Sequence, residues 1–162
     1  MQMNDKIAFV TGAGRGIGRA VCRELLQRGA AGVVIADLDG ATAQATAAKL
    51  GGLGLQCDVS DEAAVQAAVA AAIAHYGRVD VLLSNAGFGV TELDLDDALA
   101  ESNALWARMW QVHVMAHVYA SRAVLPGMLE RGQGYLVNVA SAAGLLCQVG
   151  DAAYSATKHA AV

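Results

Sequence analysis

The sequence is poor in several residue types, and each shortage argues against a class of protein. It has one proline, three cysteines and 5% aromatic residues in 162. The cysteines are far apart and include no Cys-x-x-Cys pair, which argues against a disulfide framework and against a thiolate metal site. We therefore predict that Cys22, Cys57 and Cys147 are buried free thiols.

Charged residues are also few, at 16% of the chain with a formal net charge of -4, and the basic ones are scattered. Such a chain lacks the basic patch of a nucleic-acid-binding protein, so we expect no nucleic-acid partner. No run reaches the roughly 18 apolar residues that cross a bilayer, and the amino terminus lacks a signal-peptide pattern. We therefore expect a cytoplasmic protein with no membrane partner. The 56% of hydrophobic residues argues against disorder.

Short apolar runs alternate along the chain with longer, alanine-rich stretches of helical periodicity. Near-continuous apolarity is typical of strands that are covered on both faces of a parallel sheet. The alternation predicts an α/β fold, a three-layer sandwich around a doubly wound parallel sheet. The predicted strands are residues 6–10, 33–36, 53–57, 80–84 and 135–139.

Start and stop signals mark the helices between these strands. The first helix ends near Gly29, a residue suited to a helix C-cap, and Ser60 can cap a later helix. A long helix should begin near Asn103 and be perturbed near its end by Pro126. The first helix carries an apolar stripe of Ile17, Val21 and Leu25.

A glycine-rich turn, TGAGRGIG at residues 11–18, follows the first predicted strand and opens the first helix. A turn in that position aims free backbone N–H groups and the positive helix end at an anion, and glycines let a pyrophosphate approach. A glycine-rich turn with no ligand would have the same pattern. Asp37, at the end of the second strand, can accept hydrogen bonds from both ribose hydroxyls of an adenosine.

Two charged residues bear on which dinucleotide the turn would bind, and a third bears on its adenine. The Asp37 carboxylate would repel a 2′-phosphate, which favours NAD, with NADP as the less favoured cofactor. Arg15 is the opposing signal, because an arginine there could pair with a 2′-phosphate. Asp58, which ends the third strand, can accept a hydrogen bond from the adenine amino group, or it can be a turn or N-cap aspartate ahead of Ser60.

A second group of polar residues lies near the carboxyl terminus. Tyr154 and Lys158 are four residues apart, so on a helix they share a face. A cation beside a phenol stabilises its phenolate form, which makes the tyrosine a usable acid or base. Such a pair is by itself common on helix surfaces. Ser141 follows the fifth strand at its carboxyl end, where open α/β sheets bind ligands.

Together these motifs resemble the short-chain dehydrogenase/reductase family of NAD(P)-binding, Rossmann-fold oxidoreductases. The resemblance runs from about residue 6 to 162 and rests on residues 11–18, 85–87, 138–141 and 154–158. It implies hydride transfer between NAD(H) and a small alcohol or ketone/aldehyde substrate. It implies that Tyr154 is the acid/base, that Lys158 binds the nicotinamide ribose and lowers the pKa of Tyr154, and that Ser141 and Tyr154 contact the substrate.

The same resemblance implies a set of cofactor contacts and a homodimer or homotetramer formed through the fourth and fifth helices. Asn85 and Gly87 would support the sheet centre and the close approach of the cofactor. The implied cofactor-binding residues are Gly12, Arg15, Gly16, Ile17, Gly18, Asp37, Asp58, Val59, Asn85, Ala86, Gly87, Tyr154 and Lys158.

One residue departs from the family pattern. His113 stands in the long helix where the family usually has an asparagine that helps to hold a relay water. It is either a catalytic relay group that titrates near neutral pH or a structural histidine. His117 follows one turn later, but no third ligand is evident, so we expect no metal. A dinucleotide-binding protein with little or no turnover, or a structural subunit, remain alternatives to an enzyme.

The chain is also shorter than the family usually is, because two further strand–helix units normally follow. We therefore expect residues 1–162 to be one dinucleotide-binding domain that is truncated at its carboxyl terminus. The strand at 135–139 would be an unprotected edge, and the helix from Tyr154 would have about two turns. Glu92, Asp94, Asp96, Asp97 and Glu101 receive no catalytic role. Trp106, Met109, Trp110, His113 and His117 should pack against the sheet or a partner subunit.

Overall fold

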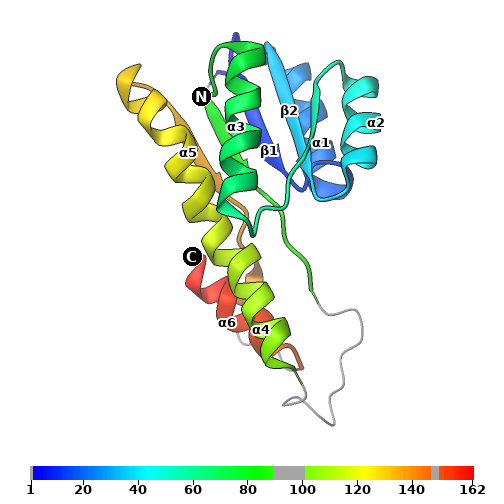
Figure 1. Cartoon of the computed structure of the whole chain (residues 1–162), viewed down its shortest axis with the longest axis vertical. Coiled ribbons are helices and arrows are strands. Elements are labelled where there is room, and N and C mark those ends of the chain that lie inside the picture. Colours follow the sequence, from blue (N-terminus) through cyan, green and yellow to red (C-terminus); the bar gives the residue numbers. More distant parts are fainter. Residues whose placement is uncertain (1, 90–100, 147–149) are drawn as a thin grey trace.

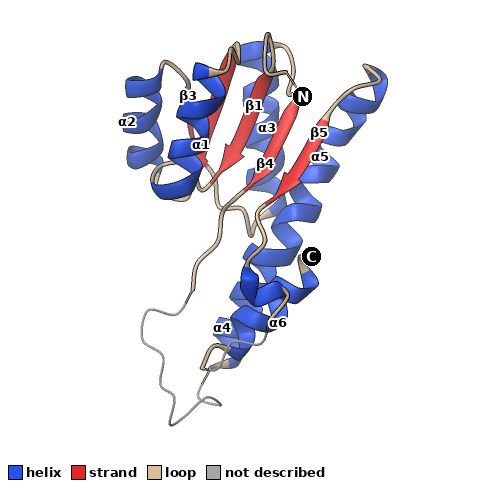
Figure 2. Ribbon diagram, turned by 180° about the vertical axis from the view of Figure 1, so that it is seen from behind, coloured by secondary structure: helices blue, strands red, loops and turns tan. Residues whose placement is uncertain are grey.

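A parallel sheet of five strands organises the chain, in the order β3-β2-β1-β4-β5 (Figure 2). The computed structural model describes residues 2–89, 101–146 and 150–162. The chain winds outward from β1 to β3 and then crosses back to β4, so the winding direction reverses between β1 and β4. The strands, each within one residue of its predicted bounds, are β1 (Ile7–Thr11), β2 (Gly32–Asp37), β3 (Leu53–Gln56), β4 (Val81–Ser84) and β5 (Tyr135–Asn138).

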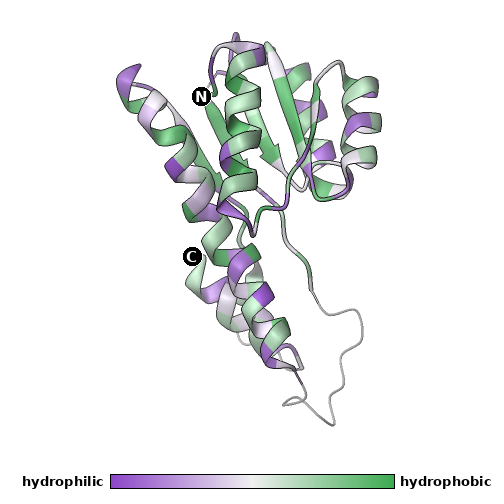
Figure 3. Cartoon of the chain, viewed as in Figure 1, coloured by the Kyte–Doolittle hydropathy of each residue, from purple (hydrophilic) through white to green (hydrophobic). Residues whose placement is uncertain are grey.

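Helices cover both faces of the sheet, which confirms the predicted three-layer, doubly wound fold. The helices α1 (Gly16–Gln27) and α2 (Gly40–Leu50) pack on one face, and α3 (Glu62–Tyr76) and α5 (Ala116–Glu130) pack on the other (Figures 1 and 2). Neighbouring side chains of β1 point to opposite faces, so Phe9 belongs to the core under α3 and α5, and Val10 to the core under α1 and α2. Figure 3 shows the central strands as mainly hydrophobic.

A long helical rod extends beyond the carboxyl ends of the strands (Figure 1). It consists of α4 (Asn103–Trp110), a π-helical turn η1 (Gln111–Met115) and α5. The predicted start at Asn103 is confirmed, but α5 runs through Pro126 to Glu130, so the departure from α-helical bonding lies at η1 rather than at the proline. A short helix, α6 (Ala152–Ala160), packs against α4 and η1, and the 3₁₀ turn η2 (Ala142–Gly144) lies beside α6.

One local prediction was wrong, and one apolar stripe is only partly packed. Ser60 does not cap α3: the Asp61 carboxylate accepts from the Ala63 N–H, because the Ser60 hydroxyl is engaged with Asp58. Ile17 is 67% exposed and so is outside the core, whereas Cys22 of the same helix is fully buried. Val21 and Leu25 are half-buried, and Leu25 packs against the core, so the apolar stripe of α1 is packed over only part of its length.

The sheet edge at β5 is as unprotected as expected, with all four residues exposed. Of the five strands, β1 alone is buried along its whole length, and β2 is buried up to Asp37. Near-continuous apolarity therefore did not predict which residues are buried in the edge strands β3 and β5. The helix α6 has nine residues, and it begins two residues before Tyr154. In the part of the chain that the structure describes, none of the helices has the length and apolar character of a membrane span.

The remaining predictions on burial are partly confirmed. Cys22 and Cys57 are buried free thiols, and burial raises their pKa to about 12 and about 11. On the rod, Met109, His113 and His117 are buried, whereas Trp106 and Trp110 are 38% and 45% exposed. Cys147, Glu92, Asp94, Asp96 and Asp97 lie outside the described residues.

Candidate active site

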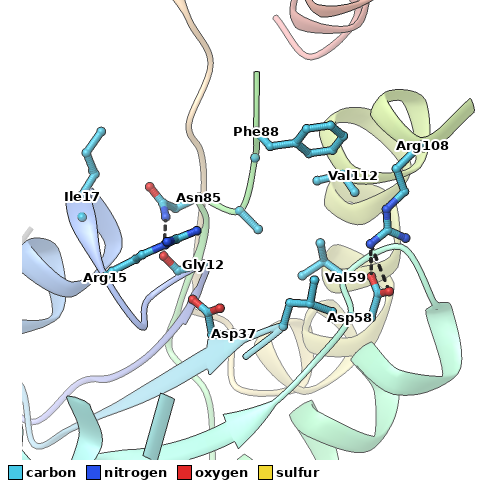
Figure 4. Close-up of a pocket in the computed structure, with 14 residues that line it drawn as sticks. Gly12, Arg15, Ile17, Asp37, Asp58, Val59, Asn85, Phe88, Arg108 and Val112 are labelled. Carbon is cyan, nitrogen blue, oxygen red and sulfur yellow. Dashed lines mark hydrogen bonds and ion pairs between the residues drawn. The ribbon is translucent and has the colours of Figure 1, made fainter. Parts of the chain in front are cut away.

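A pocket of about 690 Å³ opens at the carboxyl ends of the strands, beside the point where the winding direction reverses (Figure 4). The sheet supplies its floor, and the rod supplies one wall through α4 and η1. Of the predicted cofactor residues, all but Gly18, Tyr154 and Lys158 line it. The lining consists of Gly12, Arg15, Gly16, Ile17, Asp37, Leu38, Asp58, Val59, Asn85, Ala86, Gly87, Phe88, Arg108 and Val112.

The glycine turn presents an uncapped helix end to this pocket. No side chain caps the amino terminus of α1 at Arg15, whereas aspartate or serine side chains cap α2, α3, α4 and α6. Gly16 has a φ of 57°, and an added Cβ there would meet open space. The N–H groups in the first turn of a helix have no partner within the helix. Where they face open space, as here, they can donate hydrogen bonds to an anion.

Gly12 and Gly18 serve packing within the turn. An added Cβ at Gly12, where φ is 62°, would lie 2.8 Å from the Cα of Ala86. At Gly18 it would lie 2.5 Å from the carbonyl oxygen of Gly12, so the helix could not approach the turn as closely. Gly18 thus lies behind the pocket wall.

Asp37 and Asn85 are held by backbone groups at the pocket floor. The Asp37 Oδ2 accepts a 2.8 Å hydrogen bond from the Gly14 N–H, and its Oδ1 accepts a 3.2 Å bond from Asp39. The Asn85 Nδ2 donates to the carbonyl oxygens of Thr11 and Gly12, at 3.0 and 3.1 Å. Asn85 thereby ties the segment after β4 to the end of β1, the support that the resemblance implied.

Asp58 lies at the other end of the pocket and is already engaged. Its Oδ1 accepts from the Ser60 N–H at 3.0 Å and from the Ser60 hydroxyl at 2.7 Å, which is the turn geometry expected of one of its two interpretations. Arg108 donates to both carboxylate oxygens from α4 (Figure 4). Partial burial acts to raise the pKa of Asp58, but the hydrogen bonds from Ser60 and Arg108 outweigh it and lower that pKa.

The candidate catalytic residues adjoin the pocket through Gly87. Lys158 is 4% exposed, its ammonium lies 5.7 Å from the centre of the Tyr154 ring, and it donates to the Val139 carbonyl oxygen at 3.3 Å. Burial lowers the pKa of Lys158. A Cβ added at Gly87, which lines the pocket, would lie 3.6 Å from that ammonium. The ring of His113 packs edge-on against Tyr154, with centroids 5.4 Å apart.

His113 is fully buried, and both ring nitrogens have partners. The Phe88 N–H donates to Nε2 at 3.2 Å, so Nε2 is an acceptor and the ring proton resides on Nδ1, 2.9 Å from the Thr157 hydroxyl oxygen. That hydroxyl in turn donates to the Ala153 carbonyl oxygen at 2.8 Å. Burial, and then the charge of Lys158, lower the pKa of His113 to about 4. Its burial and its two engaged ring nitrogens favour the second of the two interpretations, a structural histidine, over a relay group that titrates near neutral pH.

Two further polar residues have simpler surroundings. The Ser141 hydroxyl oxygen accepts from the Ala143 N–H at 3.2 Å and caps η2. His117 is buried, and neither ring nitrogen has a hydrogen-bond partner among the described residues. In residues 2–89, 101–146 and 150–162, no three His, Cys, Asp or Glu side chains gather as a metal site would require.

Sequence reasoning missed three residues that this geometry uses: Arg108, Phe88 and Thr157. Arg108 lies 50 residues from its partner Asp58, and nothing in the local sequence links the two. Phe88 contributes a backbone N–H, a group that every residue except proline has. Thr157 lies inside the Tyr154–Lys158 motif. Its position next to Lys158 was the one sequence signal that could have placed it at the site.

Comparisons with known proteins define the class. The sequence profile described as short chain dehydrogenase matches residues 6–162. The chain is 36% identical to D-threitol dehydrogenase from Mycolicibacterium smegmatis, over 99% of this chain and 62% of that protein. It is 32% identical to sorbitol dehydrogenase from Cereibacter sphaeroides, over 100% of this chain and 62% of that protein.

A solved structure agrees with these sequence matches. A short chain dehydrogenase/reductase from Burkholderia phymatum, crystallised in complex with NAD, superposes with a TM-score of 0.89 at 34% identity, covering 99% of this chain and 57% of that one. The chain spans about three fifths of the length of these relatives. It belongs to the short-chain dehydrogenase family, with a Rossmann fold.

Proposed function

We propose that the protein is an oxidoreductase that transfers a hydride between NAD(H) and an alcohol or carbonyl substrate. The observation that carries this proposal is a single pocket that runs from the uncapped amino terminus of α1 to Gly87, beside the Lys158 ammonium. Its relatives are named dehydrogenases, which supports the reaction class.

The pocket residues fit a dinucleotide. The first turn of α1 and Gly16 offer N–H groups and open space to a pyrophosphate, and Asp37 offers its carboxylate to ribose hydroxyls. When bound, the nicotinamide ring supplies the hydride acceptor or donor. Gly87 leaves room for a ring beside Lys158, because any side chain there would begin 3.6 Å from the ammonium and occupy part of that space.

The proton chemistry falls to residues of α6 and η2. Tyr154 would take the proton from the substrate hydroxyl in oxidation and return it in reduction. Lys158 holds a buried positive charge beside the phenol ring, where it stabilises negative charge that develops on the oxygen. Ser141 would donate its hydroxyl hydrogen to the substrate oxygen while its own oxygen accepts from Ala143. His113 would act as a neutral positioning group behind Tyr154.

NAD is the proposed cofactor in preference to NADP. Two backbone N–H groups hold the Asp37 carboxylate at the pocket floor, so its negative charge faces the ribose position and opposes a 2′-phosphate. Arg15 also lines the pocket and is the competing signal. A homodimer or homotetramer is proposed too, supported by the exposed Trp106 and Trp110 on α4.

The test compares NADH and NADPH affinities by fluorescence titration in the wild type and in Asp37→Ala. We expect tighter NADH binding in the wild type and a preference reduced about tenfold in the variant, a change of about 1.4 kcal/mol. Asp39→Ala is the matched control, because that neighbouring carboxylate is exposed and caps α2 through Thr42. Equal or tighter NADPH binding by the wild type would refute Asp37 as the selector.

Turnover separates the enzyme from the alternative, a dinucleotide-binding protein with little catalysis. A panel of small alcohols with NAD, followed at the absorbance of NADH, should reveal at least one substrate. NADH binding without hydride transfer across the panel would favour the alternative, and absence of NADH binding would refute both.

A further inference from the structure

Arg108 joins two parts of the protein that are far apart in sequence, at the end of the pocket opposite the glycine turn. It projects from α4, and its Nη2 lies 3.2 and 3.1 Å from the two carboxylate oxygens of Asp58 (Figure 4). Its Nη1 also donates to the Ser60 hydroxyl oxygen. The guanidinium and the carboxylate both line the pocket, and their side chains are 42% and 35% exposed.

The hydrogen bonds around Asp58 make its two oxygens unequal. Oδ1 accepts from the Ser60 N–H, from the Ser60 hydroxyl and from Arg108. Among the described residues, Oδ2 accepts from Arg108 alone, at 3.1 Å. A carboxylate oxygen offers about two acceptor sites, so Oδ2 keeps one for a ligand donor. Both hydrogen bonds from Ser60 end on Oδ1 and leave the carboxylate free to rotate about it, whereas Arg108 contacts both oxygens and so fixes the plane of the carboxylate.

Apolar groups surround this polar corner in a way that suits a flat base. Val59 lies beside Asp58, Leu38 follows β2, and Val112 of η1 faces the same space. A purine ring held between such side chains would bring its edge towards Oδ2. The edge that this oxygen recognises must carry a donor, because an ionised carboxylate only accepts hydrogen bonds.

We propose that Arg108 is a specificity-determining, positioning residue for the base of the dinucleotide: it fixes Asp58 so that Oδ2 accepts from the 6-amino group of adenine. This inference rests on the proposed function, because it assumes that a dinucleotide occupies the pocket. It assigns base selection to the α4 side of the pocket, whereas Asp37 acts on the ribose. Arg108 acts through Asp58. A base with a 6-carbonyl group would place its carbonyl oxygen against Oδ2, and both of these oxygens can only accept hydrogen bonds.

The experiment compares NADH with reduced nicotinamide hypoxanthine dinucleotide, which differs from NADH by a carbonyl in place of the amino group. Affinities are measured by fluorescence titration of the full chain. We expect the wild type to prefer NADH by about 10- to 100-fold, the range for a hydrogen bond to a charged group. Arg108→Met should cut that ratio at least about threefold, because Asp58 loses its fixed plane.

A second variant and a control make the result specific. Arg108→Lys keeps the positive charge but loses the planar fork, so its ratio should lie between those of the wild type and Arg108→Met. Arg122→Met removes a different ion pair, between Arg122 of α5 and Glu62 of α3 at 3.2 Å, away from the pocket lining. That variant should keep the wild-type ratio. Thermal unfolding of each variant reports whether the fold is retained.

The possible failures are distinguishable. If the wild type discriminates between the two dinucleotides and both Arg108 variants keep its ratio, Arg108 has no role in base selection and the inference is overturned. If the wild type binds both dinucleotides equally, the Asp58 contact with adenine is wrong, while the proposed oxidoreductase stands. If the wild type binds neither dinucleotide, the proposed function fails together with this inference.

Discussion

The two ends of the candidate site are built differently. At the nucleotide end, backbone N–H groups, glycines and short polar side chains act where each strand of the sheet ends, as Asp37 does with the Gly14 N–H. At the catalytic end, the contacts join side chains from separate helices, as His113 of η1 meets Thr157 of α6. The first depends mainly on the sheet topology, to which the rod adds Arg108 and Val112, whereas the second depends on how the rod and α6 pack together.

This difference makes the two ends respond differently to substitution. A change at a strand end should alter ligand binding and leave the rest of the sheet in place. A change in the buried polar cluster should alter the folded state as well, because unpaired polar groups are costly away from water. Three substitutions test this contrast.

Tyr154→Phe should have the largest effect and should act on turnover alone. Loss of the hydroxyl removes the proton donor and acceptor, an effect typically worth 10²–10⁴-fold in rate. NADH affinity should stay within a few-fold, because the ring is retained beside Lys158. The comparison uses the alcohol on which the wild type is active.

Tyr119→Phe is the matched control, because Tyr119 donates its hydroxyl hydrogen to Gln111 at 3.1 Å on the rod, outside the pocket lining. It should keep the wild-type rate. A wild-type rate in Tyr154→Phe would mean that this phenol is not the acid/base.

The protonation of His113 should make the free energy of unfolding depend on pH. Its pKa falls from an ordinary value of 6.5 to about 4 because of burial and the Lys158 charge. Between these values the unfolded chain binds a proton that the folded chain does not, so the free energy of unfolding decreases as pH falls from 6.5 towards 4. The decrease should reach about 3 kcal/mol, and none of it should appear above pH 7.

Urea unfolding of the wild type and His113→Asn at several pH values checks this. The variant should lose most of the decrease, while the lowered pKa of His117 contributes in the same direction in both proteins. His75→Asn, a change of an exposed histidine on α3, should leave the wild-type profile intact. Equal pH profiles for wild type and His113→Asn would refute a neutral, buried His113.

Gly16→Ala should have the smallest effect and separates ligand binding from folding. Its φ of 57° makes alanine strained by about 1 kcal/mol, while the added Cβ meets open space where the pyrophosphate is proposed to lie. NADH affinity should fall about tenfold or more. Gly51→Ala shares a positive φ of 71° and open space but lies after α2.

Gly51→Ala should therefore cost similar stability, measured by urea unfolding, with unchanged NADH affinity. Equal losses of affinity in the two variants would show that the effect at Gly16 is strain, and that this turn does not contact a phosphate.

Much of the nucleotide end could be predicted from the sequence because its signals are local. Apolar runs located the strands within one residue, and the glycine turn lay directly between a strand and a helix. Asp37 and Asp58 were predicted to lie at the pocket because each stands at or just after the end of a strand. Local signals failed where a neighbour competed, as when Asp61 rather than Ser60 capped α3, and where a side chain faced the pocket instead of the core, as Ile17 does.

The sequence by itself determined the alternation of strands and helices, and through it the parallel sheet and the residues gathered at its carboxyl edge. Apolar periodicity and turn signals are local properties, and a strand–helix–strand alternation restricts the topology to parallel strands. Only the tertiary structure decided that Arg108 donates hydrogen bonds to Asp58 and that both ring nitrogens of His113 have hydrogen-bond partners. It also decided that the rod contains a π-helical segment, η1. The Arg108 and His113 contacts join residues that are 25 to 50 positions apart, so the packing of the helices against the sheet and against one another determines them.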